Sequence, residues 1–360
     1  MKHLMHYFRK KLFLGSKSQS IPYQGALLQA DLFLKQLVEE GKVPGLAISV
    51  MKQGQLYFQG GYGFADLEKK IWVTPEETLF RIASASKPIA ATALARMAGQ
   101  GTIDLDASLY TYVPYFPKKE YDFSIRQLAA HTAGIRGYRG KEYALNHPYT
   151  IRESLVVFQE APLLFRPGTD FLYNSFDWVL VSLAMEEASG IPFSDYVNNE
   201  VLNPLGMTNT MMEIPAKAIK NKAVCYSKHR SEFRLAAPVD NRYKLAGGGF
   251  LSTSEDLVKL GQAYLDQKIG PPAVIKEFLT AQLVQGRSTY YGLGWQVTQD
   301  TMGRPYFGHV GNGIGGYSNF LVYPEHQTTI AILMNCSDPR IQASLDEVLI
   351  PLFLMDAASM

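Results

Sequence analysis

The segment RIASASKPIAATA, residues 81–93, places a serine and a lysine three positions apart at the start of a predicted helix. Residues i and i+3 share one face of a helix, so the ammonium of Lys87 can reach the hydroxyl of Ser84. Pro88 fits only in the first turn, because proline has no N–H to donate to the preceding turn. The apolar spacing continues this helix to Arg96. The free N–H groups at such a helix start also favour a negative oxygen beside Ser84.

Two further segments place polar residues next to predicted elements. The segment RPGTDFLYNSFDWVL presents Tyr173 and Ser175 two positions apart, directly before a predicted helix. The segment FGHVGNGIGGYSNF, residues 307–320, presents His309 and Gly311 at the end of a predicted strand. An S-x-x-K pattern alone is weak, because so short a pattern occurs by chance. Three motifs in a fixed order are a much stronger signal.

The order S-x-x-K, Y-x-S and H-x-G resembles that of the serine beta-lactamase and penicillin-binding-protein superfamily. Within it, the chain is similar to the class C beta-lactamase-related branch, which includes esterases and D-amino-acid peptidases. The resemblance covers nearly the whole chain from residue 22, through the segments VPGLA (43–47), GYGFADL (61–67), LAAHTAG (128–134), PGT (167–169) and AGGGFLST (246–253). It implies a beta-lactamase/transpeptidase-like fold.

The resemblance also implies a reaction through an acyl-enzyme. Ser84 is expected to attack an acyl carbonyl, and its proton to pass to Lys87 or Tyr173. The backbone N–H groups of Ser84 and Asn312 are expected to hold the oxyanion. The expected site residues are Ser84, Lys87 and Tyr173 for catalysis, and Ser175, His309, Gly311 and Asn312 for substrate and oxyanion binding.

The sequence leaves the identity of the general base open. A free lysine has a pKa near 10.4, so a neutral Lys87 at pH 7 needs a shift of about three units, or about 4 kcal/mol. A Tyr173 phenolate needs a shift of similar size, supported by a cationic Lys87. The two assignments therefore compete.

Two departures from the family pattern reduce the range of substrates that we expect. Relatives that destroy beta-lactams usually carry Asn where Ser175 stands and Lys where His309 stands. A hydroxyl and a mostly neutral imidazole supply neither the amide donor nor the fixed charge. We therefore expect a peptidase or esterase with weak or absent beta-lactamase activity. The alternatives are a catalytically silent or assembly-forming scaffold of the same fold, and a penicillin-binding sensor that acylates without turnover.

Periodicity predicts an α/β (α+β) protein whose antiparallel sheet comes from both chain ends and is flanked by helices. Strands are expected at 45–52, 55–61, 291–297, 305–309, 317–323 and 328–334. Helices are expected at 26–40, 176–188, 193–201 and 341–354, and capping-box patterns predict further helix starts at Ser124, Thr150 and Ser252. The expected division is a basic N-terminal tail (1–21), an α/β lobe (22–83 with 285–360) and a mainly helical lobe (84–284).

Composition excludes several other classes of protein. The chain has 360 residues, 47% of them hydrophobic and 19% charged, which suits a large buried core. Its net charge of +2 includes no Lys/Arg-rich stripe, so no nucleic-acid partner is expected. Neither the two cysteines nor the seven histidines have metal-ligand spacing, and we expect no metal and no cofactor. His131 is expected to be a buried or hydrogen-bonded histidine. The expected partner is a small-molecule or peptide acyl substrate.

The N-terminal thirty residues form a separate electrostatic segment, with five lysines and arginines and no acidic residue. Leu12-Phe13-Leu14 is too short an apolar stretch for a secretory signal, and no apolar run is long enough for a transmembrane helix. The tail is either a solvated terminus, an organellar leader or a weak contact for an anionic membrane surface. We expect a cytoplasmic location.

Overall fold

The computed structural model describes residues 23–355 apart from positions 216 and 231. Its largest element is a seven-stranded antiparallel sheet in the order β11-β12-β13-β14-β1-β2-β3. The strands are β1 (Gly45–Lys52), β2 (Gln55–Asp66), β3 (Ile71–Trp72), β11 (Gln296–Gln299), β12 (Pro305–Gly313), β13 (Gly316–Tyr323) and β14 (Thr328–Met334). Because β14 pairs with β1, both ends of the chain contribute to the sheet, and the predicted topology is confirmed.

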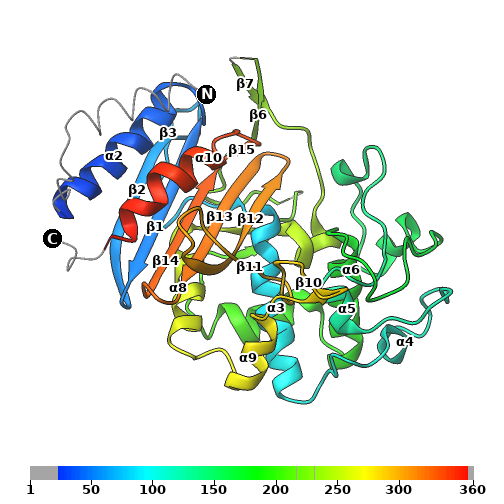
Figure 1. Cartoon of the computed structure of the whole chain (residues 1–360). Coiled ribbons are helices and arrows are strands. Elements are labelled where there is room, and N and C mark those ends of the chain that lie inside the picture. The colour runs from blue at the N-terminus through cyan, green and yellow to red at the C-terminus, as the bar shows by residue number, and fades with distance from the viewer. Residues whose placement is uncertain (1–22, 216, 231, 356–360) are drawn as a thin grey trace.

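Both faces of this sheet are covered, which explains why every residue of β13 and β14 is buried. Figure 1 shows α2 (Tyr23–Glu39) beside the C-terminal helix on one face, where α2 contacts α11 (Ile350–Phe353). On the other face α8 (Ser254–Leu265) packs against β1 and β14. One apolar core therefore lies on each side of the sheet.

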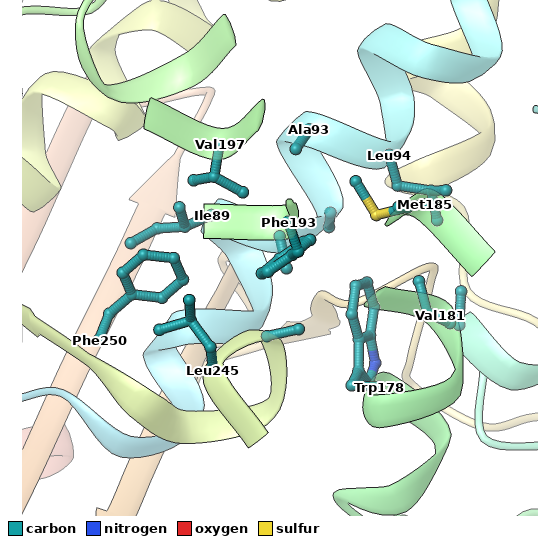
Figure 2. Close-up of a cluster of buried hydrophobic side chains, with 14 of the residues drawn as sticks. Ile89, Ala93, Leu94, Trp178, Val181, Met185, Phe193, Val197, Leu245 and Phe250 are labelled. Carbon is teal, nitrogen blue, oxygen red and sulfur yellow. The ribbon is translucent and has the colours of Figure 1, made fainter. Parts of the chain in front are cut away.

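The middle of the chain is mainly helical and surrounds α3 (Ser86–Gly99). Its neighbours are α6 (Phe176–Ser189), α7 (Phe193–Val197) and α9 (Pro272–Phe278). Figure 2 shows how apolar side chains of α3, α6 and α7 meet those of Leu245 and Phe250; the labelled residues of the three helices are Ile89, Ala93, Leu94, Trp178, Val181, Met185, Phe193 and Val197. Burying each large side chain contributes roughly 1.5–3 kcal/mol. This core holds α3 and α6 together, and the segments that enter these two helices carry Ser84 and Tyr173.

The shorter helices differ in detail from the predictions. The capping box at Ser124 forms as predicted and starts α5 (Ile125–Ala129). Thr150 also exchanges hydrogen bonds with Glu153, but only a 3-10 turn follows. The prediction for Ser252 is wrong by one residue: Ser252 ends β8 (Phe250–Ser252), and the side chain of Thr253 caps α8.

The predicted strand 291–297 is wrong over most of its length, because only Gln296–Gln299 forms β11. Gly294 has a φ of +81°, which a regular strand does not allow. A Cβ at this position would lie 2.7 Å from the Cβ of Ala91, so the loop has to pass tightly over α3. Tyr291, which lies in this loop, is buried.

The basic tail lies outside the described residues. Within residues 23–355, apart from the two positions named above, no helix combines the length and the apolar character needed to cross a bilayer. Cys225 and Cys336 are both free thiols.

Candidate active site

Ser84 and Lys87 lie at the entrance to α3. Ser84 is the middle residue of a 3-10 turn, Ala83–Ala85, which runs directly into the helix. Lys87 is fully buried, and its Nζ lies 3.2 Å from Ser84 Oγ. The same Nζ donates to the backbone carbonyl of Gly247 at 2.7 Å. The predicted i,i+3 arrangement therefore brings the two side chains into hydrogen-bond distance.

Tyr173 approaches the same oxygen from the other segment. Its hydroxyl donates to Ser84 Oγ at 2.7 Å, and its ring centroid lies 4.7 Å from Lys87 Nζ. Tyr173 as a whole residue is 39% exposed, and its hydroxyl bonds to Ser84 Oγ, so solvent reaches this side of the site. Ser84 Oγ thus lies between the amine of Lys87 and the phenol of Tyr173. These are the two candidates for the general base that the sequence does not distinguish.

Burial acts in opposite directions on these two groups. Removal from water lowers the pKa of Lys87 from 10.5 to about 7, with Asp177 opposing the shift and Lys244 adding to it. Desolvation of its hydroxyl raises the pKa of Tyr173 well above the ordinary 10.0. Near pH 7, then, a large share of Lys87 is neutral and able to accept a proton, whereas Tyr173 keeps its own.

The strand β12 forms a wall beside Ser84. A Cβ on Gly311 would lie 2.9 Å from the backbone N of Ser84 and closer still to the carbonyl oxygen of Ile82. Real Cβ atoms do not approach backbone atoms so closely, so this position requires glycine. Asn312 is the next residue, and its side-chain oxygen accepts from the backbone N–H of Asp338 at 3.1 Å. The backbone of β12 therefore runs against the N–H of Ser84.

We expect Gly311→Ala to reduce the reactivity of Ser84 by about a hundredfold, because misplacing a reacting group by about 1 Å has effects of that size. The rate of inactivation by a fluorophosphonate serine probe measures this loss. Gly270→Ala is the matched control, since an added Cβ there meets only the tip of Ile275 at 4.0 Å. Equal inactivation rates for Gly311→Ala and the wild type would contradict the close approach.

His309 lies in the same wall but faces inward. Its Nδ1 lies 2.7 Å from the carbonyl oxygen of Val310, so Nδ1 carries the proton and donates. Its Nε2 accepts from the hydroxyl of Tyr291 at 3.1 Å. Burial lowers the pKa of His309 to about 3, and the nearby Lys87 adds to the effect. The imidazole is therefore neutral, with both nitrogens engaged inside the protein.

Ser175 lies close to Gly247, the residue whose carbonyl binds Lys87. It precedes α6, and its Cβ would lie 3.4 Å from a Cβ built on Gly247, whose carbonyl binds Lys87. Ser175 is also a neighbour of Tyr138, where it opposes the rise that burial causes in the pKa of the phenol. Ser175 is thus near the site and partly accessible to solvent.

The structure brings all the predicted site residues into one region. Ser84, Lys87 and Tyr173 are joined by hydrogen bonds, and Gly311 touches the backbone of Ser84. Sequence analysis did not name four residues that surround this group, which are Tyr138, Asp177, Gly247 and Tyr291. Gly247 contributes a backbone carbonyl, which has no side-chain signal. Nothing in the sequence distinguishes Tyr291 from the other tyrosines, because its contact with His309 is made across the fold. For His131, the prediction of a buried, hydrogen-bonded residue is confirmed.

The sequence of this chain is similar to those of known proteins. The family model described as "Beta-lactamase" matches residues 30–350. The serine beta-lactamase-like protein LACTB, mitochondrial, from Homo sapiens is 28% identical over 396 residues, covering 83% of this chain and 72% of the relative.

Solved structures show the same fold. An octameric penicillin-binding protein homologue from Pyrococcus abyssi superposes with a TM-score of 0.79 at 25% identity, covering 91% of this chain and 77% of that chain. EstCE1, a hydrolase with promiscuous acyltransferase activity, has a TM-score of 0.79 at 21% identity, covering 93% of this chain and 100% of that chain. The family model spans well over half of the sequence, and the chain therefore belongs to the beta-lactamase family.

Proposed function

We propose that this protein is a serine hydrolase that acts through an acyl-enzyme on a peptide or ester carbonyl. One observation carries the proposal: Ser84 Oγ lies 3.2 Å from Lys87 Nζ and 2.7 Å from the hydroxyl of Tyr173. A serine is a weak nucleophile until a neighbouring base takes its proton. The lowered pKa of Lys87, about 7, supports the lysine as that base.

Acylation then follows from the positions of these groups. The proton of Ser84 moves to Nζ of Lys87 while Oγ forms a bond to the substrate carbonyl carbon. The backbone N–H groups of Ser84 and Asn312 donate to the oxyanion. As the tetrahedral intermediate collapses, the bond to the leaving nitrogen or oxygen breaks, and that atom takes a proton from Tyr173. The ammonium of Lys87 returns a proton to Tyr173, which leaves both groups in their starting states.

Deacylation uses the same groups in reverse order. A water molecule enters on the open side of Tyr173 and gives its proton to Lys87 as its oxygen bonds to the acyl carbon. The bond between that carbon and Ser84 Oγ breaks, and Oγ takes the proton from Lys87, which becomes neutral again. The released product is a carboxylic acid, and the enzyme is ready for another substrate.

His309 and Ser175 favour a neutral acyl donor over a beta-lactam as the substrate. The carboxylate of a beta-lactam is bound most strongly by a fixed cation. His309 is neutral, and its two nitrogens already bond to Val310 and Tyr291. Ser175 offers one hydroxyl where an amide side chain would offer two donors. We therefore propose p-nitrophenyl esters and short peptides as substrates, with beta-lactams turned over slowly or not at all.

The proposal is tested with a fluorophosphonate probe, intact-protein mass spectrometry and peptide mapping. The expected result is one adduct on Ser84, together with hydrolysis of esters or of D- or L-amino-acid peptides. No adduct between pH 6 and 9 would contradict the proposal and favour a catalytically silent scaffold. An adduct without turnover of any substrate would favour a sensor that acylates once.

The pH dependence of labelling is a separate prediction. Neutral Lys87 is the active form, so the labelling rate should rise with pH through a midpoint near 7 and become constant above it. The rate constant for probe inactivation, measured from pH 5.5 to 9.5, gives this midpoint. A midpoint near 10 would instead indicate an unperturbed amine or phenol and would contradict Lys87 as the base.

We keep the cytoplasmic location as a prediction for this chain. The human relative LACTB is a mitochondrial protein by its name. The basic, acid-free tail is compatible with an organellar leader, so imaging of the full chain with a C-terminal tag separates the two locations.

A further inference from the structure

Tyr291 packs against four other aromatic rings beside the proton-transfer groups. Its ring centroid lies 4.9 Å from that of His131, 5.8 Å from those of Tyr173 and His309, and 6.0 Å from that of Phe171. The ring of Tyr173 meets it edge to face, at an interplanar angle of 70°. Such edge contacts between aromatic rings are favourable and directional. Tyr291 therefore contacts the proposed acid of the reaction, although the mechanism above gives Tyr291 no part.

The backbone around Tyr291 is constrained on both sides. The preceding residue, Tyr290, has a φ of +54°, a conformation that non-glycine residues seldom adopt. A Cβ on the following residue, Gly292, would lie 2.1 Å from the carbonyl oxygen of Phe278, so this position requires glycine. The carbonyl of Tyr291 itself accepts from the backbone N–H of Gln282 at 2.8 Å. Strained backbone persists only where the surrounding structure fixes it, and it is common at functional sites.

The hydroxyl of Tyr291 connects this loop to the strand β12. It donates to Nε2 of His309 at 3.1 Å, while Nδ1 of the same ring donates to the carbonyl of Val310 at 2.7 Å. The imidazole cannot change its tautomer without breaking one of these bonds. The ring of His309 lies 5.8 Å from that of Tyr173, measured between centroids. Tyr291 thus contacts Tyr173 directly and also holds a second ring that contacts it.

Tyr173 needs such support during the reaction. In the free enzyme its hydroxyl donates to Ser84 Oγ at 2.7 Å. Once Oγ is bonded to the substrate carbon it becomes a weaker acceptor, just when the phenol has to give its proton to the leaving atom. A general acid works only within hydrogen-bond distance of that atom. Because Tyr173 is 39% exposed, its position then depends on the rings on its protein side.

We propose that Tyr291 is a positioning residue for this step: its ring holds Tyr173 in place for proton transfer to the leaving group, and its hydroxyl holds His309 against the same phenol. The inference rests on the proposed function and extends it. Tyr291 is buried, so it acts through Tyr173 and not on the substrate. His309 then belongs to the support of Tyr173, with both ring nitrogens used inside the protein.

The choice of leaving group makes this role measurable. p-Nitrophenolate is a weak base and departs without a proton, whereas an alkoxide needs one from a general acid. A p-nitrophenyl ester and an alkyl ester of the same carboxylic acid form the same acyl-enzyme. The ratio of kcat/KM for the p-nitrophenyl ester to that for the alkyl ester therefore reports the proton step of acylation.

Tyr291→Leu removes both the ring and the hydroxyl. Its kcat/KM for the alkyl ester should fall about a hundredfold, and that for the p-nitrophenyl ester by no more than about threefold. The ratio should therefore rise by a factor of about thirty or more. Tyr291→Met, whose flexible side chain fills the space without a ring, takes its place if Tyr291→Leu does not fold. A ratio equal to that of the wild type, whatever the loss of stability, would overturn the proposal.

Tyr323→Leu is the matched control for the loss of a buried tyrosine. Tyr323 ends β13 and packs in the core on the other face of the sheet, where its ring is next to those of Tyr306 and His326. This variant should lower the melting temperature and leave the ratio unchanged. An equal rise of the ratio in Tyr323→Leu and Tyr291→Leu would show a general effect of destabilisation and would also overturn the proposal.

Tyr291→Phe keeps the ring and removes only the hydroxyl. In protein whose histidines carry 15N, the signals of His309 are assigned by their loss in His309→Gln. The Nε2 signal should move in Tyr291→Phe toward that of a nitrogen without a hydrogen-bond donor. An unchanged Nε2 signal would show that Tyr291 does not hold His309 and would overturn the proposal. This comparison requires no turnover, so it still decides the point if the wild type hydrolyses no ester, a result that would refute the proposed function.

Discussion

Replacing Ser84 with Ala should abolish probe labelling and reduce hydrolysis by a factor of about 10⁴ or more, as expected when a catalytic nucleophile is removed. Ser84 Oγ is the atom on which the hydrogen bonds from Lys87 and Tyr173 converge. Without it, both groups lose their shared partner and no covalent intermediate forms. Intact-protein mass spectrometry and hydrolysis of the best ester in the panel measure the two effects.

Ser86→Ala is the control for this variant. Ser86 is the first residue of α3, two positions after Ser84; it is fully buried and accepts a hydrogen bond from the backbone N–H of Phe250 at 3.2 Å. Its loss should lower the melting temperature and leave the labelling of Ser84 in place. Hydrolysis by Ser84→Ala at the wild-type rate would show that another residue is the nucleophile.

Lys87→Met should combine a large loss of activity with a gain in stability. The loss is about a thousandfold in acylation, because Ser84 no longer has a base to accept its proton. The gain follows from burial: a pKa lowered from 10.5 to about 7 corresponds to roughly 5 kcal/mol of destabilisation when the unfolded lysine is charged. Met fills similar space without a charge, although the carbonyl of Gly247 loses its donor.

The sign of the pH dependence makes this prediction specific. A lysine with a lowered folded-state pKa destabilises the protein fully below pH 7, and the effect fades as the pH rises toward 10.5. The advantage of Lys87→Met in denaturant unfolding should therefore be largest near pH 6 and small above pH 10. Lys244→Met, at a second buried lysine whose pKa is lowered to about 8, should gain stability and still be labelled at pH 8. If Lys87→Met is less stable than the wild type at pH 6, burial of Lys87 does not destabilise the folded protein as proposed.

The sequence predicts those parts of the molecule that depend on local spacing. The pairing of Ser84 with Lys87 is a property of one helix start, so the i,i+3 spacing is sufficient to predict it. The strands 45–52, 317–323 and 328–334 are mostly apolar segments rich in β-branched and aromatic residues, and the structure has strands there. The sheet from both chain ends follows from where these runs lie along the chain.

Other features depend on contacts between distant segments and have no local signal. His131 meets Asp177 across 46 positions, and the hydrogen bond between Tyr291 and His309 joins a glycine-broken loop to a strand. The two residues of each pair are not separated by a spacing that belongs to a known sequence motif. The choice between Lys87 and Tyr173 also depended on burial, because desolvation moves an amine and a phenol in opposite directions. The amount of burial is a property of the folded molecule.

The pairing of β14 with β1 has a consequence for biosynthesis. A ribosome releases β1, then Ser84, Lys87 and Tyr173, long before it releases the strand that carries Gly311. Until β12, β13 and β14 are added, β1 has no partner on one side and Ser84 has no wall beside it. Such distant pairings also form slowly, because a long loop must close first. Ser84 is therefore not in a complete site while the polypeptide is growing. The site is complete only when β12, β13 and β14 have joined the sheet.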